Sequence, residues 1–151
     1  MSKDSSGLFS GTSGAKSATK STYSTTVLKQ RISTKIDSSI RNTPGGKGKS
    51  MIVGAYDKKT GKTSVSFAGP IPKRIHPELK KLADKIGGLG SKGVSGKNTV
   101  GVCAEFQTVN KLLWSGSKLS DIRLTKPIRP RTGKEMPFCP NCAKMFKDLI
   151  K

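Results

Sequence analysis

Three cysteines and one glutamate stand at spacings that suit metal-assisted proton transfer. Cys103 and Glu105 are two positions apart, and Cys139 and Cys142 form a Cys-x-x-Cys pair further along the chain. Both groups come directly before expected helices, where unsatisfied N–H groups and the positive end of the helix dipole stabilise thiolates. Three thiolates on one zinc ion leave the fourth tetrahedral position free for water, as catalytic zinc sites do. We therefore expect Cys103, Cys139 and Cys142 to bind Zn²⁺.

Glu105 has the position of a proton carrier in such a site. Near a helix start, residues two positions apart can both reach toward the end of the axis, so Glu105 can contact a zinc-bound water while Cys103 binds the metal. Zinc lowers the pKa of its water toward neutrality, which makes hydroxide available to attack an electron-poor ring carbon. Glu105 would take the proton from that water, pass it to the ring nitrogen and then protonate the departing amine.

Two other interpretations use the same cysteines differently. With His76 as a fourth ligand, the site would be a closed Cys3His structural zinc in a basic nucleic-acid-binding module without catalysis. Against this, His76 stands at an expected helix start, where a capping role is ordinary. Cys139 and Cys142 could instead be a thioredoxin-like redox pair, which would leave Cys103 without a role.

The charge of the chain points to a polyanionic partner. Lys and Arg outnumber Asp and Glu by 29 to 9 in 151 residues, giving a net charge of +20, and the excess is spread over the whole sequence. Such a charge draws a protein to nucleic acid through counterion release, and an acidic protein partner fits it equally. No apolar run approaches the ~20 residues needed to span a bilayer, so membrane insertion is not expected. An odd number of cysteines argues against a disulfide framework.

The first half of the chain must supply one layer of helix and part of a sheet. Residues 1–24 are rich in Ser, Thr, Gly and Lys and are expected to be a flexible linker, which leaves 25–151 for the domain. Apolar residues at every fourth position from Leu28 to Ile40 predict a helix. The runs 51–56 and 63–68 predict a hairpin of two strands, and the first should be central because both its faces are apolar.

The second half must bring the cysteines together. A stripe of apolar residues predicts a helix that opens at His76, and the glycine-rich stretch 87–97 predicts a mobile loop before Cys103. Helices are expected again around 102–113 and 143–150, with a strand at 119–124 between them. This order predicts a three-layer α/β/α domain in which helices cover a small mixed sheet.

The motifs resemble those of a known family. Cys-Ala-Glu at 103–105 and Cys-Pro-Asn-Cys at 139–142 resemble the signature of the cytidine deaminase-like superfamily. Together with Ala-Tyr-Asp-x-x-Thr-Gly at 55–61 and His-Pro-Glu-Leu at 76–79, they make residues 50–148 similar to the YwqJ-type deaminases, which are C-terminal toxin domains of bacterial polymorphic secretion systems. The resemblance implies the cytidine deaminase-like fold and a hydrolase that converts cytosine to uracil in nucleic acid.

The resemblance also implies a biological setting and further contacts. The domain would be secreted or injected as part of a larger toxin, act in the cytoplasm of the target cell and be neutralised by a cognate immunity protein, which the charge suggests is acidic. Ala104 is implied to hydrogen-bond the base, and Asn98 is a candidate for touching the target nucleotide. Because a target base must leave its stack to reach the zinc, single-stranded DNA or RNA should be preferred.

Two departures from the wider superfamily affect these expectations. The first ligand is Cys103 instead of the commoner His, which makes zinc a weaker Lewis acid unless the helix N-termini, with Arg129 or Arg131, compensate. The sequence ends nine residues after Cys142. That leaves no room for the two further strands usual in the superfamily, so the sheet is expected to lack them. Trp114 could stack on a base, although packing is its more ordinary use.

Overall fold

The computed structural model describes residues 24–94 and 96–150, so the expected linker at 1–24 lies outside the described residues except for Ser24. The elements in chain order are α1 (Thr25–Asn42), η1 (Gly46–Gly48), β1 (Ile52–Asp57), β2 (Thr63–Phe67), α2 (Pro77–Asp84), α3 (Ala104–Trp114), η2 (Leu119–Asp121), β3 (Ile122–Leu124) and α4 (Pro140–Met145). No helix among the described residues is both long and apolar enough to cross a membrane.

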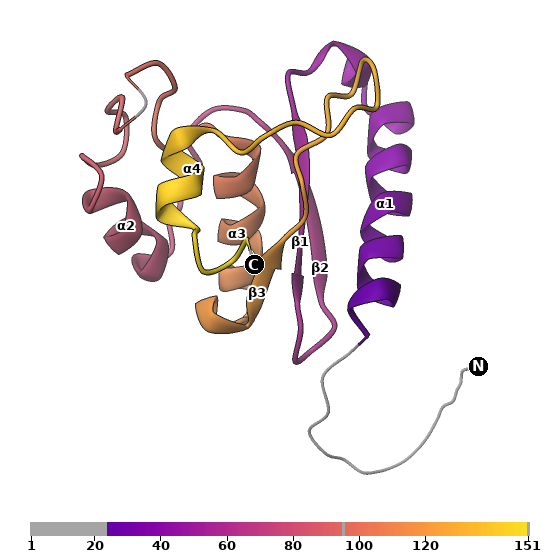
Figure 1. Ribbon diagram of the computed structural model, residues 1–151, viewed down its shortest axis with the longest axis horizontal. Coiled ribbons are helices and arrows are strands. Elements are labelled where there is room, and N and C mark those ends of the chain that lie inside the picture. Colours follow the sequence, from indigo (N-terminus) through magenta and orange to yellow (C-terminus); the bar gives the residue numbers. More distant parts are fainter. Residues whose placement is uncertain (1–23, 95, 151) are drawn as a thin grey trace.

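The three strands form one sheet between layers of helix. Their order is β2-β1-β3, and β1 pairs antiparallel with both neighbours, with Gly54 opposite Val65 and Ala55 opposite Leu124. All six residues of β1 are buried, which confirms that this strand is central. Helix α1 covers one face of the sheet, and α3 covers the other with α4 and α2 beside it (Figure 1). The chain is therefore a three-layer α/β/α domain.

The sheet is antiparallel throughout, so the expectation of a mixed sheet is wrong in this respect. No two strands among the described residues pair in parallel, and residues 146–150, which follow α4, contain no strand. Instead, the backbone N–H of Leu124 in β3 donates to the carbonyl of Leu149 at 2.8 Å. The end of the chain thus covers part of the edge of β3 that lacks a neighbouring strand.

Two expected elements are shorter in the structure than the sequence pattern suggested. The strand expected at 119–124 is half 3₁₀ helix, since η2 occupies its first three residues. The helix expected at 143–150 ends at Met145, and Phe146 leaves the helical conformation with φ −113°. The non-helical turn after Met145 places both Phe146 and Leu149 in the larger core, and the carbonyl of Leu149 accepts from the N–H of Leu124.

Each sheet face has its own apolar core. Beneath α1, the buried side chains of Leu28, Ile32 and Ile36 pack on Ile52 and Tyr56. Beneath α3 lies the larger core, which includes Phe106, Val109 and Leu113, as expected of core residues without a chemical role. The larger core also contains Cys142 and Phe146 of the α4 region, so burial of apolar area anchors the start of α4 against α3.

Gly54 allows α1 to approach the sheet closely. A Cβ atom at this position would collide with Cγ2 of Ile32. We expect Gly54→Ala to lower the free energy of unfolding by about 1–3 kcal/mol, because overpacking forces the helix away from the strand. Chemical denaturation measures the change, with Gly48→Ala as a control at a position where a Cβ meets nothing within 4 Å. Equal stability of both variants would show that α1 adjusts freely.

Candidate metal centre

Two helices begin at the cysteines. Cys103 is the N-cap of α3 and Cys139 is the N-cap of α4, each with extended backbone before the first helical turn. Pro140 follows at the first position of α4, where its missing N–H removes no helical hydrogen bond. The two helix starts meet, and this brings together residues that are far apart in the sequence.

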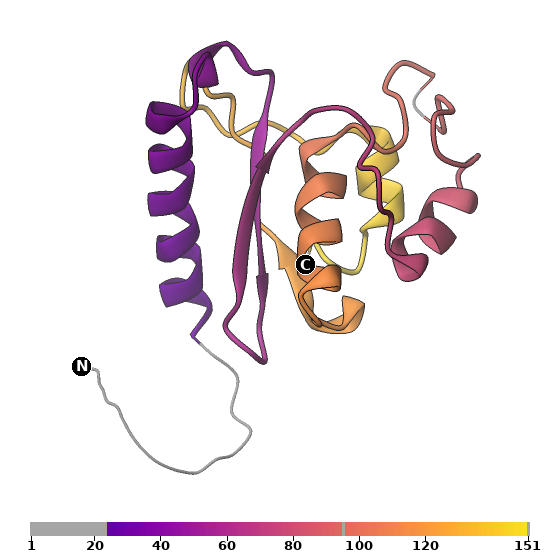
Figure 2. The same ribbon diagram turned by 180° about the vertical axis from the view of Figure 1, so that it is seen from behind.

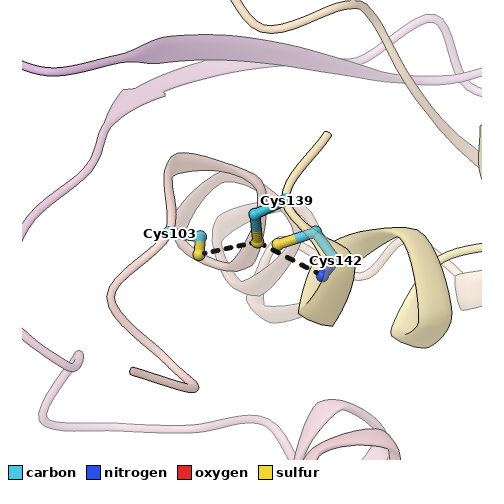
Figure 3. A group of neighbouring side chains, drawn as sticks. All are labelled: Cys103, Cys139 and Cys142. Atoms are coloured by element: carbon cyan, nitrogen blue, oxygen red, sulfur yellow. Dashed lines mark hydrogen bonds between the residues drawn. The ribbon is translucent and has the colours of Figure 1, made fainter. Parts of the chain in front are cut away.

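The three sulfur atoms form a compact cluster (Figure 3). All Sγ atoms lie within 4.8 Å of one another. The Sγ of Cys139 is in the middle: it is 3.4 Å from the Sγ of Cys103 and accepts a hydrogen bond from the backbone N–H of Cys142 at 3.4 Å. Cys142 is fully buried, whereas Cys103 and Cys139 are half-buried, so the cluster reaches solvent on the side of those two.

This cluster could hold a metal ion. Thiolates bound at ~2.3 Å around a tetrahedral zinc ion stand about 3.8 Å apart, so sulfur atoms within 4.8 Å of one another need little movement to bind one. Among the residues that the structure describes, these cysteines are the one group of three or more His, Cys, Asp or Glu side chains placed to share a metal. Three sulfur ligands leave the fourth tetrahedral position open, which is typical of catalytic zinc.

His76 lies outside the cysteine group. Its Nδ1 accepts a hydrogen bond from the backbone N–H of Glu78 at 3.2 Å, so it is the N-cap of α2, as expected. The edge of its ring meets Trp114, with the ring centroids 4.9 Å apart. The closed Cys3His site therefore does not have His76 as its fourth ligand in this structure.

Negative charge in the cluster is concentrated on one sulfur. Hydrogen bonds from the thiols of Cys103 and Cys142 lower the pKa of Cys139, and backbone N–H groups at the start of α4 lower it further. The pKa of Cys103 is raised because its thiol donates to Cys139, and the pKa of Cys142 is raised by hydrogen bonds with both other sulfurs and by burial. The expected stabilisation of thiolates at helix starts therefore applies to Cys139. It does not apply to Cys103, whose side chain makes no capping hydrogen bond.

Glu105 lies beside the sulfur cluster without belonging to the ligand group. Only 4% of the surface of Glu105 is exposed to solvent. The carboxylate accepts a hydrogen bond from its own backbone N–H at the start of α3, and Cys142 is close enough for its thiol proton to be shared between this carboxylate and Cys139. Burial raises the pKa of Glu105 to about 7, and the negative charge of Cys139 adds to the rise. A carboxyl group with a pKa near neutrality can both accept and release a proton at physiological pH.

Ala104 and Asn98 differ in how they relate to the site. Ala104 is the first residue of α3 and its methyl group is buried in the larger core, so only its backbone is left for hydrogen bonding. Asn98 is exposed directly after the glycine-rich loop, and its carbonyl accepts a hydrogen bond from Nδ2 of Asn141 at 2.9 Å. This bond ties the loop to the helix start that carries the Cys-x-x-Cys pair.

Asn141 is a residue of the site that the sequence did not single out. It is fully buried, its Oδ1 accepts from the backbone N–H of Val94 at 2.8 Å, and its Nδ2 also donates to the carbonyl of Lys92 at 3.3 Å. Gly93 has φ +57° and passes so close that a Cβ would collide with Oδ1 of Asn141. The side chain of Asn141 therefore ties the loop that was expected to be mobile to the start of α4. In the sequence, the position of Asn141 between Cys139 and Cys142 was the one feature that could have pointed to it.

We expect Asn141→Ala to lower the free energy of unfolding by about 2–4 kcal/mol, because the buried amide of Asn141 loses its hydrogen bonds to three backbone groups in or next to the loop. Amide hydrogen exchange at Val94 should accelerate, since its N–H loses the Oδ1 acceptor. The exposed Asn42→Ala on α1 is the matched control and should be near neutral. Unchanged exchange at Val94 would contradict the anchoring role.

The hairpin that carries Arg129 and Arg131 does not approach the cysteines. It is closed by a hydrogen bond from the backbone N–H of Arg129 to the carbonyl of Lys134 at 2.9 Å. A groove of about 510 Å³ separates it from α1 and is lined by both. In Figure 2 this hairpin lies at the top, on the α1 side of the sheet. Charge compensation by these arginines has no support in the structure.

The site thus joins three kinds of group at the meeting point of two helix starts. Three cysteines are placed to bind a metal ion, a buried carboxyl group lies beside them, and a loop is held against the same helix. This combination is able to activate a small molecule on a metal and to move a proton next to it. Comparisons with protein-family models, with curated proteins and with solved structures find no match to this chain.

Proposed function

We propose that this chain is a zinc-dependent hydrolase that deaminates cytosine to uracil in nucleic acid. The observation that carries the proposal is the buried carboxyl group of Glu105 beside three cysteines that leave one coordination position open. A purely structural zinc site would have a fourth protein ligand and would have no use for a buried carboxyl group next to it. The motif resemblance to YwqJ-type deaminases supports the same reaction.

The cysteines and Glu105 have separate roles in this reaction. Cys103, Cys139 and Cys142 would hold zinc, which supplies a Lewis acid able to make hydroxide available at neutral pH. Glu105 accepts a proton from the attacking water and delivers it to the ring nitrogen of cytosine. It then takes the second proton from the hydroxyl group added to the ring and gives it to the departing amine, so that water and cytosine become uracil and ammonia. Burial of Glu105 keeps competing water away from this proton path.

The net charge of +20 supports nucleic acid as the substrate. Cations spread over the chain attract phosphates from any direction, and release of their counterions favours association. A base inside a duplex cannot reach a metal at a helix start, so we propose that unpaired DNA or RNA is preferred. Specific recognition of one base would then depend on the groups around the cysteines, including the backbone of Ala104 and the side chain of Asn98.

We further propose that the chain is a toxin domain delivered as part of a larger protein and active in the cytoplasm of a target cell. Support comes from the resemblance to YwqJ-type toxin domains. A cognate acidic immunity protein would neutralise it, since a surface with this excess of Lys and Arg attracts an acidic partner strongly.

A defined set of substrates tests the reaction. Zinc-loaded protein is incubated with single-stranded DNA, single-stranded RNA and duplexes, and the nucleosides are then quantified by mass spectrometry. We expect uridine or deoxyuridine to appear with one equivalent of ammonia, mainly from unpaired substrate. Appearance of inosine would change the target base to adenine. No product from any substrate at full zinc occupancy would contradict the proposal.

A further inference from the structure

Trp114 and Arg74 form an exposed aromatic and cationic surface at the end of α3 away from the cysteines. Trp114 is the single tryptophan of the chain, and it is 44% exposed. The guanidinium carbon of Arg74 lies 4.3 Å from the centroid of its ring. The pair thus offers an exposed aromatic ring and an arginine side by side, two groups on which a flat ligand can stack.

The backbone beneath this pair is fixed by α3. Nε1 of Trp114 donates to the carbonyl of Arg74 at 3.1 Å, and Nδ2 of Asn110 donates to the same oxygen at 2.8 Å. Oδ1 of Asn110 accepts from the backbone N–H of His76 at 2.9 Å. The pair is therefore already held in place, which reduces the entropy that a ligand would lose by ordering it.

The segment 69–76 connects this surface with the candidate metal centre. It starts beside Cys103, where the N–H of Gly69 donates to the carbonyl of Val102 at 3.0 Å, and Gln107 holds it by donating to the carbonyls of Gly69 and Pro70. Figure 2 shows it passing over the start of α3 and descending beside the helix to α2. The 11 residues of α3 span ~16 Å at ~1.5 Å per residue, a distance that a few nucleotides of extended strand can cover.

A cavity of about 740 Å³ adjoins the same surface. His76, whose ring contacts Trp114, lines it together with the cations Lys118 and Arg123. Two acidic side chains, Glu78 and Asp148, also face it. The exposed Lys73 precedes Arg74 in the connecting segment. Cations therefore predominate over acids around the aromatic pair, which suits phosphate groups beside a stacked base.

We propose that Arg74, Trp114 and the adjoining cavity bind unpaired nucleotides that flank the target base. This inference rests on the proposed function for the position of that base, at the cysteines. Bases stack on exposed aromatic rings and on arginine planes, while Arg74, Lys118 and Arg123 neutralise phosphates. The planar stacking surface favours a nucleic acid over an acidic protein, which would need carboxylate-binding cations but no stacked ring.

The single tryptophan reports directly on this site. In the zinc-loaded Glu105→Gln variant, which separates binding from turnover, we titrate oligothymidylate of about 12 nucleotides at fixed salt. We expect saturable quenching of Trp114 fluorescence. In anisotropy titrations of the labelled strand, Arg74→Ala and Trp114→Ala should each weaken binding about tenfold, because each removes a stacking partner. Arg31→Ala, an exposed arginine of α1 beyond the sheet, is the matched control and should change the affinity less than about twofold.

Three results would overturn the inference. The first is absence of quenching together with equal affinity of all variants. The second is full affinity of Arg74→Lys, which keeps the charge but loses the plane, because stacking on Arg74 would then contribute nothing. The third is quenching by polyglutamate but not by the oligonucleotide, which would indicate an acidic protein partner. Circular dichroism of each variant checks that it is folded. Quenching without any deamination by the unmodified chain would leave this site standing and defeat the proposed reaction alone.

Discussion

Replacement of Cys139 by serine is expected to remove zinc from the protein. Cys139 is the middle sulfur of the cluster, in contact with Cys103 and with the backbone of Cys142, and it has the lowered pKa that attracts a cation first. A serine hydroxyl does not ionise near neutral pH, so one ligand and the preformed negative charge are lost together. Elemental analysis should find about one zinc per unmodified chain and close to none in the variant.

The same substitution should remove the stabilisation that zinc provides. Zinc at 1,000 times its Kd stabilises a folded protein by about 4 kcal/mol, and here it would join the starts of α3 and α4. A chelator should therefore lower the Tm of the unmodified protein and leave that of Cys139→Ser unchanged. Reducing conditions are needed throughout, because Cys103 and Cys139 are close enough to interact directly. Full zinc occupancy in Cys139→Ser would contradict the assignment of the cluster as a metal centre.

Glu105→Gln is expected to abolish turnover while leaving zinc and fold intact. Glutamine has nearly the same shape as glutamate but cannot carry a proton, and proton transfer by a positioned side chain contributes about 10²–10⁴ in rate. The substitution also removes a buried ionisable group whose pKa is raised by burial, so stability should not fall. The rate of uracil formation, the zinc content and the Tm measure the three expectations.

Glu135→Gln provides the control for the loss of one negative charge. Glu135 is exposed and lies in the hairpin near α1, so its replacement should leave the rate within about twofold of the unmodified chain. If Glu105→Gln kept its activity in a clean preparation, the carboxyl group would not be the proton carrier. If it lost both zinc and activity, Glu105 would instead be needed to hold the site together.

The cysteine cluster could be predicted because its signal is local. Cys-x-Glu and Cys-x-x-Cys at helix starts fix which atoms lie at the ends of two helices, and burial of Phe106 and Cys142 in one core brings those ends together. The central position of β1 was equally visible, because an apolar strand without a polar face must be covered on both sides.

Contacts between a side chain and a distant backbone group could not be predicted, because no pattern in the sequence indicates them. Asn141 binds the carbonyl and N–H groups of a loop more than 40 positions earlier, and any residue type supplies such groups. In the same way, the apolar stripe at 143–150 did not reveal that α4 ends at Met145 or that the carbonyl of Leu149 accepts from the N–H of Leu124 in β3. Local periodicity predicts which face of a helix is buried, whereas the length of the helix also depends on tertiary contacts of the residues that follow it.

Sequencing of DNA and RNA from cells that briefly express this chain tests the central claim most directly. The Glu105→Gln variant, expressed to the same level and checked for zinc, is sequenced in parallel. A base deaminase of the proposed kind should produce C-to-T changes in DNA or C-to-U changes in RNA with the unmodified chain alone. Absence of transitions from soluble, zinc-loaded protein, or equal numbers of them with both chains, would contradict it.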